Sequence, residues 1–207
     1  MGCVTQPRKI LRKWRGFLPL GVREFVPSSI GLAGSLLIAH PNLLDPNFRR
    51  SVLFISASDA EEGAFGVILN RPAGRTVGEI LPNAQFGALS RIPVFLGGPV
   101  STDQLIFASF RWHEETERYE CQHHLEMEDA EQAVRDDQAI VRAFVGYAGW
   151  SKGQLEQELA QRAWLVGKPP REILDLEQCP LMWRELTSSY GPWFRLLAEA
   201  PDEPSRN

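Results

Sequence analysis

The chain has 207 residues, of which 43% are hydrophobic and 23% charged, and this balance excludes an intrinsically disordered or fibrous protein. A formal net charge of −4 argues against a nucleic-acid-binding surface over the whole body. Three widely spaced cysteines are typical of a reducing compartment, and no apolar run approaches the roughly 18 residues of a membrane span. We therefore expect a cytoplasmic protein without a transmembrane segment.

The first 29 residues differ from the rest of the chain in charge. They contain six basic residues and one acidic residue, Glu24. Leu11, Trp14 and Leu18 recur at helical spacing, with basic residues between them. We predict a basic N-terminal arm, residues 1–29, which is flexible or packs on its own domain. Contact with nucleic acid or a membrane surface is a further possibility for this arm.

The body of the chain contains many short apolar runs separated by Pro, Asn, Asp and Gly. The pattern predicts strands at 35–40, 51–57, 64–70, 93–96, 105–110, 140–147 and 164–166. Helical spacing predicts helices at 154–162 and 181–190, with an i,i+4 ion pair between Glu158 and Arg162 in the first. Residues 111–139 favour a hairpin or excursion and a surface helix. These elements predict one α+β domain at 30–195 with a mixed sheet, followed by a polar tail at 196–207.

Residues 149–153 spell G-x-S-x-G, which is the sequence of a hydrolase nucleophile elbow. All four histidines precede Ser151, whereas the histidine of an α/β-hydrolase follows its nucleophile. A structural interpretation accounts for the same residues. Ser151 and Gln154 can form a capping box, and Trp150 and Leu155 can form the hydrophobic staple that accompanies it. We therefore predict a helix cap here and no catalytic residue.

A second cluster, Cys121, His123 and His124 followed by Glu126 and Glu128, invites a metal interpretation. A stable site needs three or four converging ligands, and no second pair with suitable spacing exists in the sequence. On a regular strand His123 would share a face with Cys121, while His124 would point to the other face. The sequence therefore predicts neither a metal nor a cofactor.

Glycine-rich turns indicate where an anion could bind. Gly97 and Gly98 follow a predicted strand, Asn70 and Arg71 end another, and the predicted helix that starts near Gly153–Gln154 presents backbone N–H groups. Together these residues form a hypothetical ligand-binding cleft. Each also has a structural alternative, since the glycines can allow a close approach of two backbones and Arg71 can bind an acid at the sheet edge.

Several of these segments resemble the AlgH/YqgE family of bacterial proteins, in family order and over most of the chain. The similar segments are 34–41, 45–52, 63–72, 97–100, 146–150 and 153–159. The resemblance implies an α+β domain whose mixed sheet curls towards a partial barrel flanked by helices. It implies no established reaction. Family members are often labelled transcriptional regulators, but no helix-turn-helix pattern is present in this sequence.

These observations favour a non-catalytic binding or regulatory module for a small anionic ligand or a protein partner. The first alternative is a hydrolase-type enzyme that uses Asp45 or Glu79 with Arg71, which requires a carboxylate with a raised pKa inside a pocket. The second alternative is recruitment to nucleic acid or a membrane through the basic arm.

Overall fold

The structure of the protein is a computed structural model that describes residues 31–83 and 86–200. The strands are β1 (Leu36–Ala39), β2 (Val52–Asp59), β3 (Gly63–Ile68), β4 (Pro72–Thr76), β5 (Pro93–Leu96), β6 (Val100–His113), β7 (Arg118–Leu125), β8 (Ala139–Trp150) and β9 (Trp164–Gly167). The helices are α1 (Val77–Ile80), α2 (Met127–Val134), α3 (Gln154–Ala160), α4 (Cys179–Ser188), α5 (Pro192–Glu199) and the 3-10 helices η2 (Gly87–Arg91), η3 (Arg171–Leu174) and η4 (Leu176–Gln178). The predicted arm, residues 1–29, lies outside the described residues.

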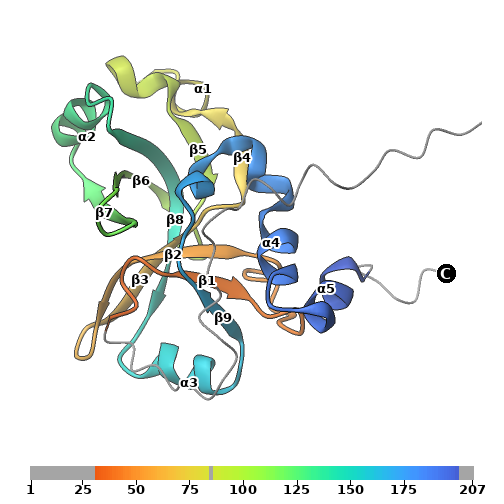
Figure 1. The fold of residues 1–207 in the computed structure, drawn as a ribbon. Helices are drawn as coiled ribbons and strands as arrows, with labels where there is room; N and C mark the ends of the chain where they lie inside the picture. Colours follow the sequence, from red (N-terminus) through yellow and green to blue (C-terminus); the bar gives the residue numbers. More distant parts are fainter. Residues whose placement is uncertain (1–30, 84–85, 201–207) are drawn as a thin grey trace, which may run out of the picture.

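The long strand β8 joins two parts of the sheet. Its first part lies between β5, which is parallel to it, and β6, which is antiparallel. Its last residues pair with β3, which continues into β2, β1 and β9 in antiparallel order. Figure 1 shows β8 running through the molecule from α2 at one end to α3 at the other. The mixed sheet that the sequence predicted is confirmed.

The helices flank a sheet that curls into a half-barrel, as the family resemblance implied. The helix α2 packs on β6 and β8, α3 on β3 and β9, and α4 on β1. At the far side of α4 lies α5, the last described helix (Figure 1). None of the helices in residues 31–83 and 86–200 combines the length and apolar character needed to cross a membrane.

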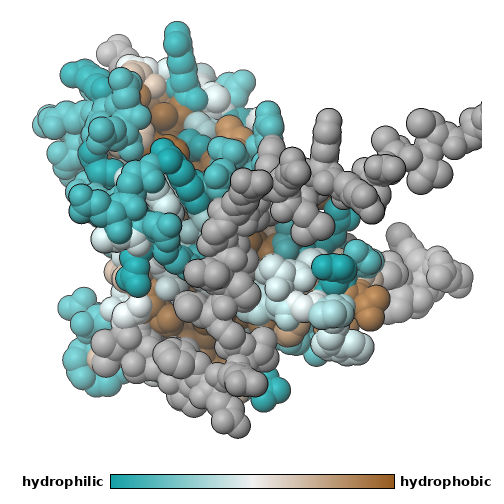
Figure 2. Space-filling view, viewed as in Figure 1, coloured by the Kyte–Doolittle hydropathy of each residue, from teal (hydrophilic) through white to brown (hydrophobic). Residues whose placement is uncertain are grey.

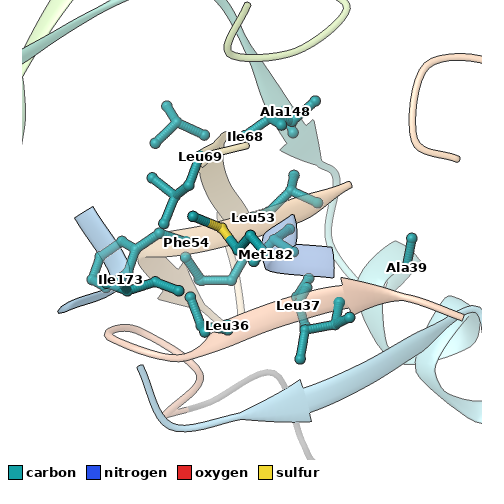
Figure 3. Close-up of a cluster of buried hydrophobic side chains, with 14 of the residues drawn as sticks. Leu36, Leu37, Ala39, Leu53, Phe54, Ile68, Leu69, Ala148, Ile173 and Met182 are labelled. Atoms are coloured by element: carbon teal, nitrogen blue, oxygen red, sulfur yellow. The ribbon is translucent and has the colours of Figure 1, made fainter. Parts of the chain in front are cut away.

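The main core lies between the half-barrel and the C-terminal helices. Strand β1 is buried along its whole length, because it is covered on both faces and paired on both edges. Full burial of one such leucine contributes about 1.5–3 kcal/mol to stability. The ring of Phe54 packs edge-on against Phe110, with ring centroids 5.4 Å apart. Figure 3 shows this core, where side chains of the half-barrel meet Ile173 and Met182.

Strand β4 and the extent of helix α5 are among the features that were not expected from the sequence. Strand β4 contains Pro72 and Gly74, and proline and glycine are residue types that separate the predicted strands, but β4 is an edge strand, where proline costs no ladder hydrogen bond. Residues 196–199, assigned to the polar tail, belong to helix α5. This helix begins with Pro192, a favoured residue in a first turn, and its Ala198 is only 3% exposed.

Candidate functional site

The predicted cleft residues Asn70 and Arg71 hold a neighbouring loop in place. Arg71 donates from Nη1 to the carbonyl of Asn47 at 2.6 Å and from Nη2 to the carbonyl of Arg49 at 3.1 Å. Partial burial lowers the pKa of Arg71, and the nearby Asp45 carboxylate opposes this shift. The Asn70 amide bonds the same stretch of backbone through both Oδ1 and Nδ2. Arg71 therefore binds backbone carbonyls of the loop between β1 and β2.

The predicted glycine turn allows two backbones to meet. Gly97 donates its N–H to the carbonyl of Val145 at 2.9 Å and accepts from the N–H of Ile68 at 2.9 Å. A Cβ on Gly98 would lie 2.2 Å from the carbonyl atoms of Tyr147. The glycines of this turn therefore allow the backbone after β5 to approach the backbone of β8 closely. This was the structural alternative to anion binding at the turn.

The predicted cleft segments lie along strand β3 and its neighbours. Asn70 follows one end of β3, and Gly97 lies beside that end through its bond to Ile68. At the other end of β3, Ala64 pairs with Trp150, just before Gly153. Ala64 and Ile68 lie four residues apart on β3, which corresponds to about 13 Å of extended chain. The predicted cleft residues thus lie along β3, towards both of its ends, and the ligand-binding cleft stays a prediction.

The predicted helix cap is only half present. The side-chain Oε1 of Gln154 accepts hydrogen bonds from the backbone N–H and the hydroxyl of Ser151, both at 3.2 Å. The hydroxyl of Ser151 donates to this side chain, whereas a full capping box would have it accept a backbone N–H. The reason is that α3 starts later, after Gly153, whose φ of 78° is left-handed. Trp150 and Leu155, the predicted staple, are 4% and 1% exposed in the core.

The carboxylates of the hydrolase alternative lack the environment that it requires. Glu79 is exposed and accepts from the backbone N–H of Thr76 at 2.7 Å, which lowers the pKa of Glu79 below its usual range. Asp45 is also exposed, and its Oδ1 accepts from the N–H of Asn47 at 2.8 Å. Neither carboxylate is enclosed in a pocket, which is the placement that the hydrolase alternative requires.

The two adjacent histidines lie on the same side of β7, so the prediction that His124 points away is wrong. A β-bulge causes this, since Ala108 pairs with His123 and the preceding Phe107 pairs with Leu125, which leaves His124 unpaired with φ of 53°. Both imidazole rings contact Phe65, with centroids 4.5 and 4.9 Å from it. Within residues 31–83 and 86–200, no three ligand-type side chains converge on a possible metal position.

Because His123 is partly buried, we predict that the folded protein loses stability at acidic pH. Burial and the nearby His124 lower the pKa of His123 from its ordinary value of 6.5, so below about pH 6.5 the unfolded chain binds this proton more readily than the folded one. We expect the melting temperature to fall between pH 7 and pH 5, and His123→Phe, which keeps the stacking on Phe65, to reduce that fall. Thermal unfolding at both pH values checks this. An equal fall in the variant would contradict it.

The residue that carries a candidate site is Arg142, near the start of β8. It shares the core face of the strand with Phe144, which is fully buried. Its guanidinium donates to the carbonyls of Val141 at 3.0 Å and Leu174 at 2.9 Å and lies 6.0 Å from the ring centroid of Phe95. Burial lowers the pKa of Arg142, and nearby groups that include the Asp175 carboxylate oppose this shift. No described carboxylate forms an ion pair with it.

A pocket of about 560 Å³ opens beside this guanidinium. We call it the Arg142 pocket, and its apolar walls are Ile92, Val134, Ile140, Leu174 and Leu176. Asp175 and Glu177 also line it and are exposed. Partial burial of a cation that forms no ion pair costs free energy, and an anionic ligand would offset that cost. The combination of aliphatic walls and one guanidinium is typical of a small-molecule site.

Sequence reasoning missed Arg142. The only signal is a single arginine within the apolar run 139–148, and such a residue more often faces solvent. The segment that covers it, residues 171–178, consists of two 3-10 helices that no periodicity indicated.

Comparison with known proteins assigns this chain to a family. A family model described as AlgH-like matches residues 36–195. The chain belongs to the AlgH-like family. A UPF0301 protein of Streptomyces coelicolor is 36% identical over 188 residues, covering 85% of this chain and 95% of that protein. A UPF0301 protein of Stutzerimonas stutzeri is 37% identical over 176 residues, covering 78% of this chain and 90% of that protein.

Two solved structures share the architecture of this AlgH-like chain. The solution structure of the AlgH protein from Pseudomonas aeruginosa has a TM-score of 0.56 and 27% identity, covering 83% of this chain and 95% of that one. A crystal structure from Corynebacterium diphtheriae, at 18% identity, has a TM-score of 0.54 and covers 81% and 92% of the two chains. The second likeness supports the fold alone.

Proposed function

We propose that the protein is a non-catalytic binding module whose Arg142 pocket holds a small molecule with one carboxylate on an apolar body. The partly buried guanidinium, which forms no ion pair with a described carboxylate, carries this proposal. A guanidinium has five N–H donors, and the two bonds of Arg142 go to neutral carbonyls, so its charge is not neutralised by them. A ligand carboxylate would neutralise the charge and use further donors. We place this module in the cytoplasm, on the cysteine usage of the chain.

The residues that line the Arg142 pocket favour some classes of anion over others. Aliphatic side chains such as Ile140 and Leu176, which are 36% and 46% exposed, favour a ligand with an aliphatic or aromatic body. Asp175 and Glu177 at the same pocket repel additional negative charge, which disfavours phosphates and other multiply charged anions. A regulatory role, as the family label suggests, would then consist of sensing such an acid.

The test is calorimetric titration of the full chain with octanoate, benzoate and inorganic phosphate. We expect one carboxylate to bind and phosphate not to bind. Arg142→Met should weaken carboxylate binding about 30-fold, which is the loss of about 2 kcal/mol from a charge-assisted hydrogen-bonded pair. Arg118→Met, on exposed β7, makes the same charge change outside the pocket and should have no effect.

A second variant separates binding from folding. Leu176→Glu alters the exposed mouth of the Arg142 pocket, so it should leave the unfolding transition unchanged and still weaken carboxylate binding. Undiminished binding in both Arg142→Met and Leu176→Glu would contradict the proposal, as would the absence of binding by every carboxylate tested.

A further inference from the structure

The last described helix, α5, presents large apolar side chains to solvent. Only Arg195 and Glu199 of this helix are polar or charged. Its Ala198 is 3% exposed and anchors it to the fold, whereas Trp193 and Leu196 are 66% and 63% exposed. Residues three positions apart lie side by side on a helix, so these two side chains form one surface, which we call the α5 face. Adjacent large apolar side chains on a surface are typical of an interaction site.

The contacts of α5 with the rest of the fold use a different side of the helix. It packs against α4, and the ring centroid of Phe194 lies 5.6 Å from that of His40 in the loop between β1 and β2. Arg50 of the same loop donates to the carbonyl of Ala200 at 2.8 Å. Figure 1 shows α5 at an edge of the molecule beyond α4, and Figure 2 shows hydrophobic surface at that position. The α5 face therefore points outward.

The charge around the α5 face is positive, although the whole chain has a net charge of −4. Helices α4 and α5 and the loop between β1 and β2 contain four arginines and three carboxylates. One of these arginines, the exposed Arg195, lies on α5 itself. The predicted arm, residues 1–29, adds six basic residues against one acidic residue. Like charge thus disfavours the arm as the occupant of the α5 face, and an anionic partner is complementary to both.

We infer that the α5 face inserts into the surface of a membrane that contains anionic lipids. An indole favours the boundary between headgroups and acyl chains, because its ring is apolar and its N–H is polar, and Trp193 fits that position. Leu196 would enter the acyl region, while Arg195 beside it would bind headgroup phosphates. A small apolar contact binds a membrane only weakly, and the positive charge of the arm would supply the second attraction that stable binding needs.

The first test is co-sedimentation of the full chain with two kinds of vesicle. One is pure phosphatidylcholine, and the other contains equal parts of phosphatidylcholine and phosphatidylglycerol. We expect binding to the mixed vesicles alone, and less binding as salt is raised. Leu196→Glu should weaken it about tenfold, because the burial of a leucine side chain is lost. Leu81→Glu is the matched control, since it makes the same charge change at an exposed leucine beside α1, in another part of the molecule (Figure 1).

The second test measures whether Trp193 enters the lipid. Mixed vesicles that carry brominated acyl chains quench only those tryptophans that reach these chains. Trp14→Phe removes the tryptophan of the arm, and Trp150, Trp164 and Trp183 are buried in the fold. We expect quenching in the Trp14→Phe protein and its loss when Trp193→Phe is added. Quenching that persists in the double variant would contradict insertion of the α5 face.

Other results would also overturn the proposal. Equal weakening by Leu196→Glu and Leu81→Glu would show charge repulsion without insertion. Absence of binding to mixed vesicles would reject the membrane as partner, and a dimer that only Leu196→Glu dissociates would then assign the α5 face to a second copy of the chain. Binding to duplex DNA in place of vesicles would assign it to nucleic acid. None of these results depends on carboxylate binding at the Arg142 pocket, whose lining residues both glutamate variants leave unchanged.

Discussion

Gly98→Ala should lower the free energy of unfolding by about 3 kcal/mol, because overpacking against rigid backbone cannot be relieved by a rotamer change. A Cβ at this position would lie 2.2 Å from both C and O of Tyr147 and 2.5 Å from N of Ala148. Those atoms belong to β8, the strand that joins both parts of the sheet. Moving them would disturb the pairing of β8 with β3 as well. Equilibrium unfolding in urea measures the change.

Gly149→Ala is the control for this experiment. Gly149 lies on the same strand, but a Cβ there would meet only the ring of Tyr147, at 3.3 Å, which is the movable end of a side chain. We expect a loss below about 1 kcal/mol, as for an ordinary substitution at an exposed position. Similar losses in the two variants would show that the approach of Gly98 to β8 is not tightly constrained.

Much of the fold could be predicted from the sequence, because most strands are short apolar runs that lie between residues such as Pro, Asn, Asp and Gly. Strand β1, with Leu36 and Leu37, is buried on both faces and appears in the sequence as an uninterrupted apolar stretch. Edge strand β4 was not accessible, because the edge position that makes Pro72 acceptable is a property of the sheet and not of the local sequence. The end of α5 could not be predicted either, because it depends on the burial of Ala198 against the rest of the fold, which the local sequence does not show.

The candidate sites were less accessible, because each depends on pairing between distant segments. The guanidinium of Arg142 is enclosed only when residues 171–178 fold over β8, and Leu174 then supplies a carbonyl to it. Similarly, His124 turns towards Phe65 only because β6 and β7 pair with a bulge. Alternation along a strand predicts side-chain direction only where pairing is regular. Neither the bulge nor the covering segment leaves a pattern in the sequence around Arg142 or His124.

Glu158→Ala should lower the free energy of unfolding by about 3 kcal/mol, because it leaves two buried indole donors without an acceptor. Sequence spacing predicted an ion pair with Arg162. The structure instead directs Oε2 of Glu158 at two indoles, accepting from Nε1 of Trp150 at 2.9 Å and from Nε1 of Trp164 at 2.7 Å. Both tryptophans are 4% exposed. The Glu158 carboxylate therefore links α3 to Trp150, the last residue of β8, and to Trp164, the first residue of β9.

Two further variants separate this role from helix propensity and from charge. Gln157→Ala, at an exposed position of the same helix, should be neutral or slightly stabilising, because alanine is the better helix former. Glu158→Gln keeps the volume and one acceptor oxygen, which can still accept from both indoles, but it removes the negative charge that strengthens these hydrogen bonds, so its loss of stability should be smaller than that of Glu158→Ala. A shift in tryptophan emission should accompany the loss, since both donors are indoles. Equal free energies of unfolding for Glu158→Ala and Gln157→Ala would contradict this prediction. The two hydrogen bonds would then add no more stability than the hydrogen bonds that the indoles make with water in the unfolded chain. The attachment of α3 would in that case depend on the burial of Leu155.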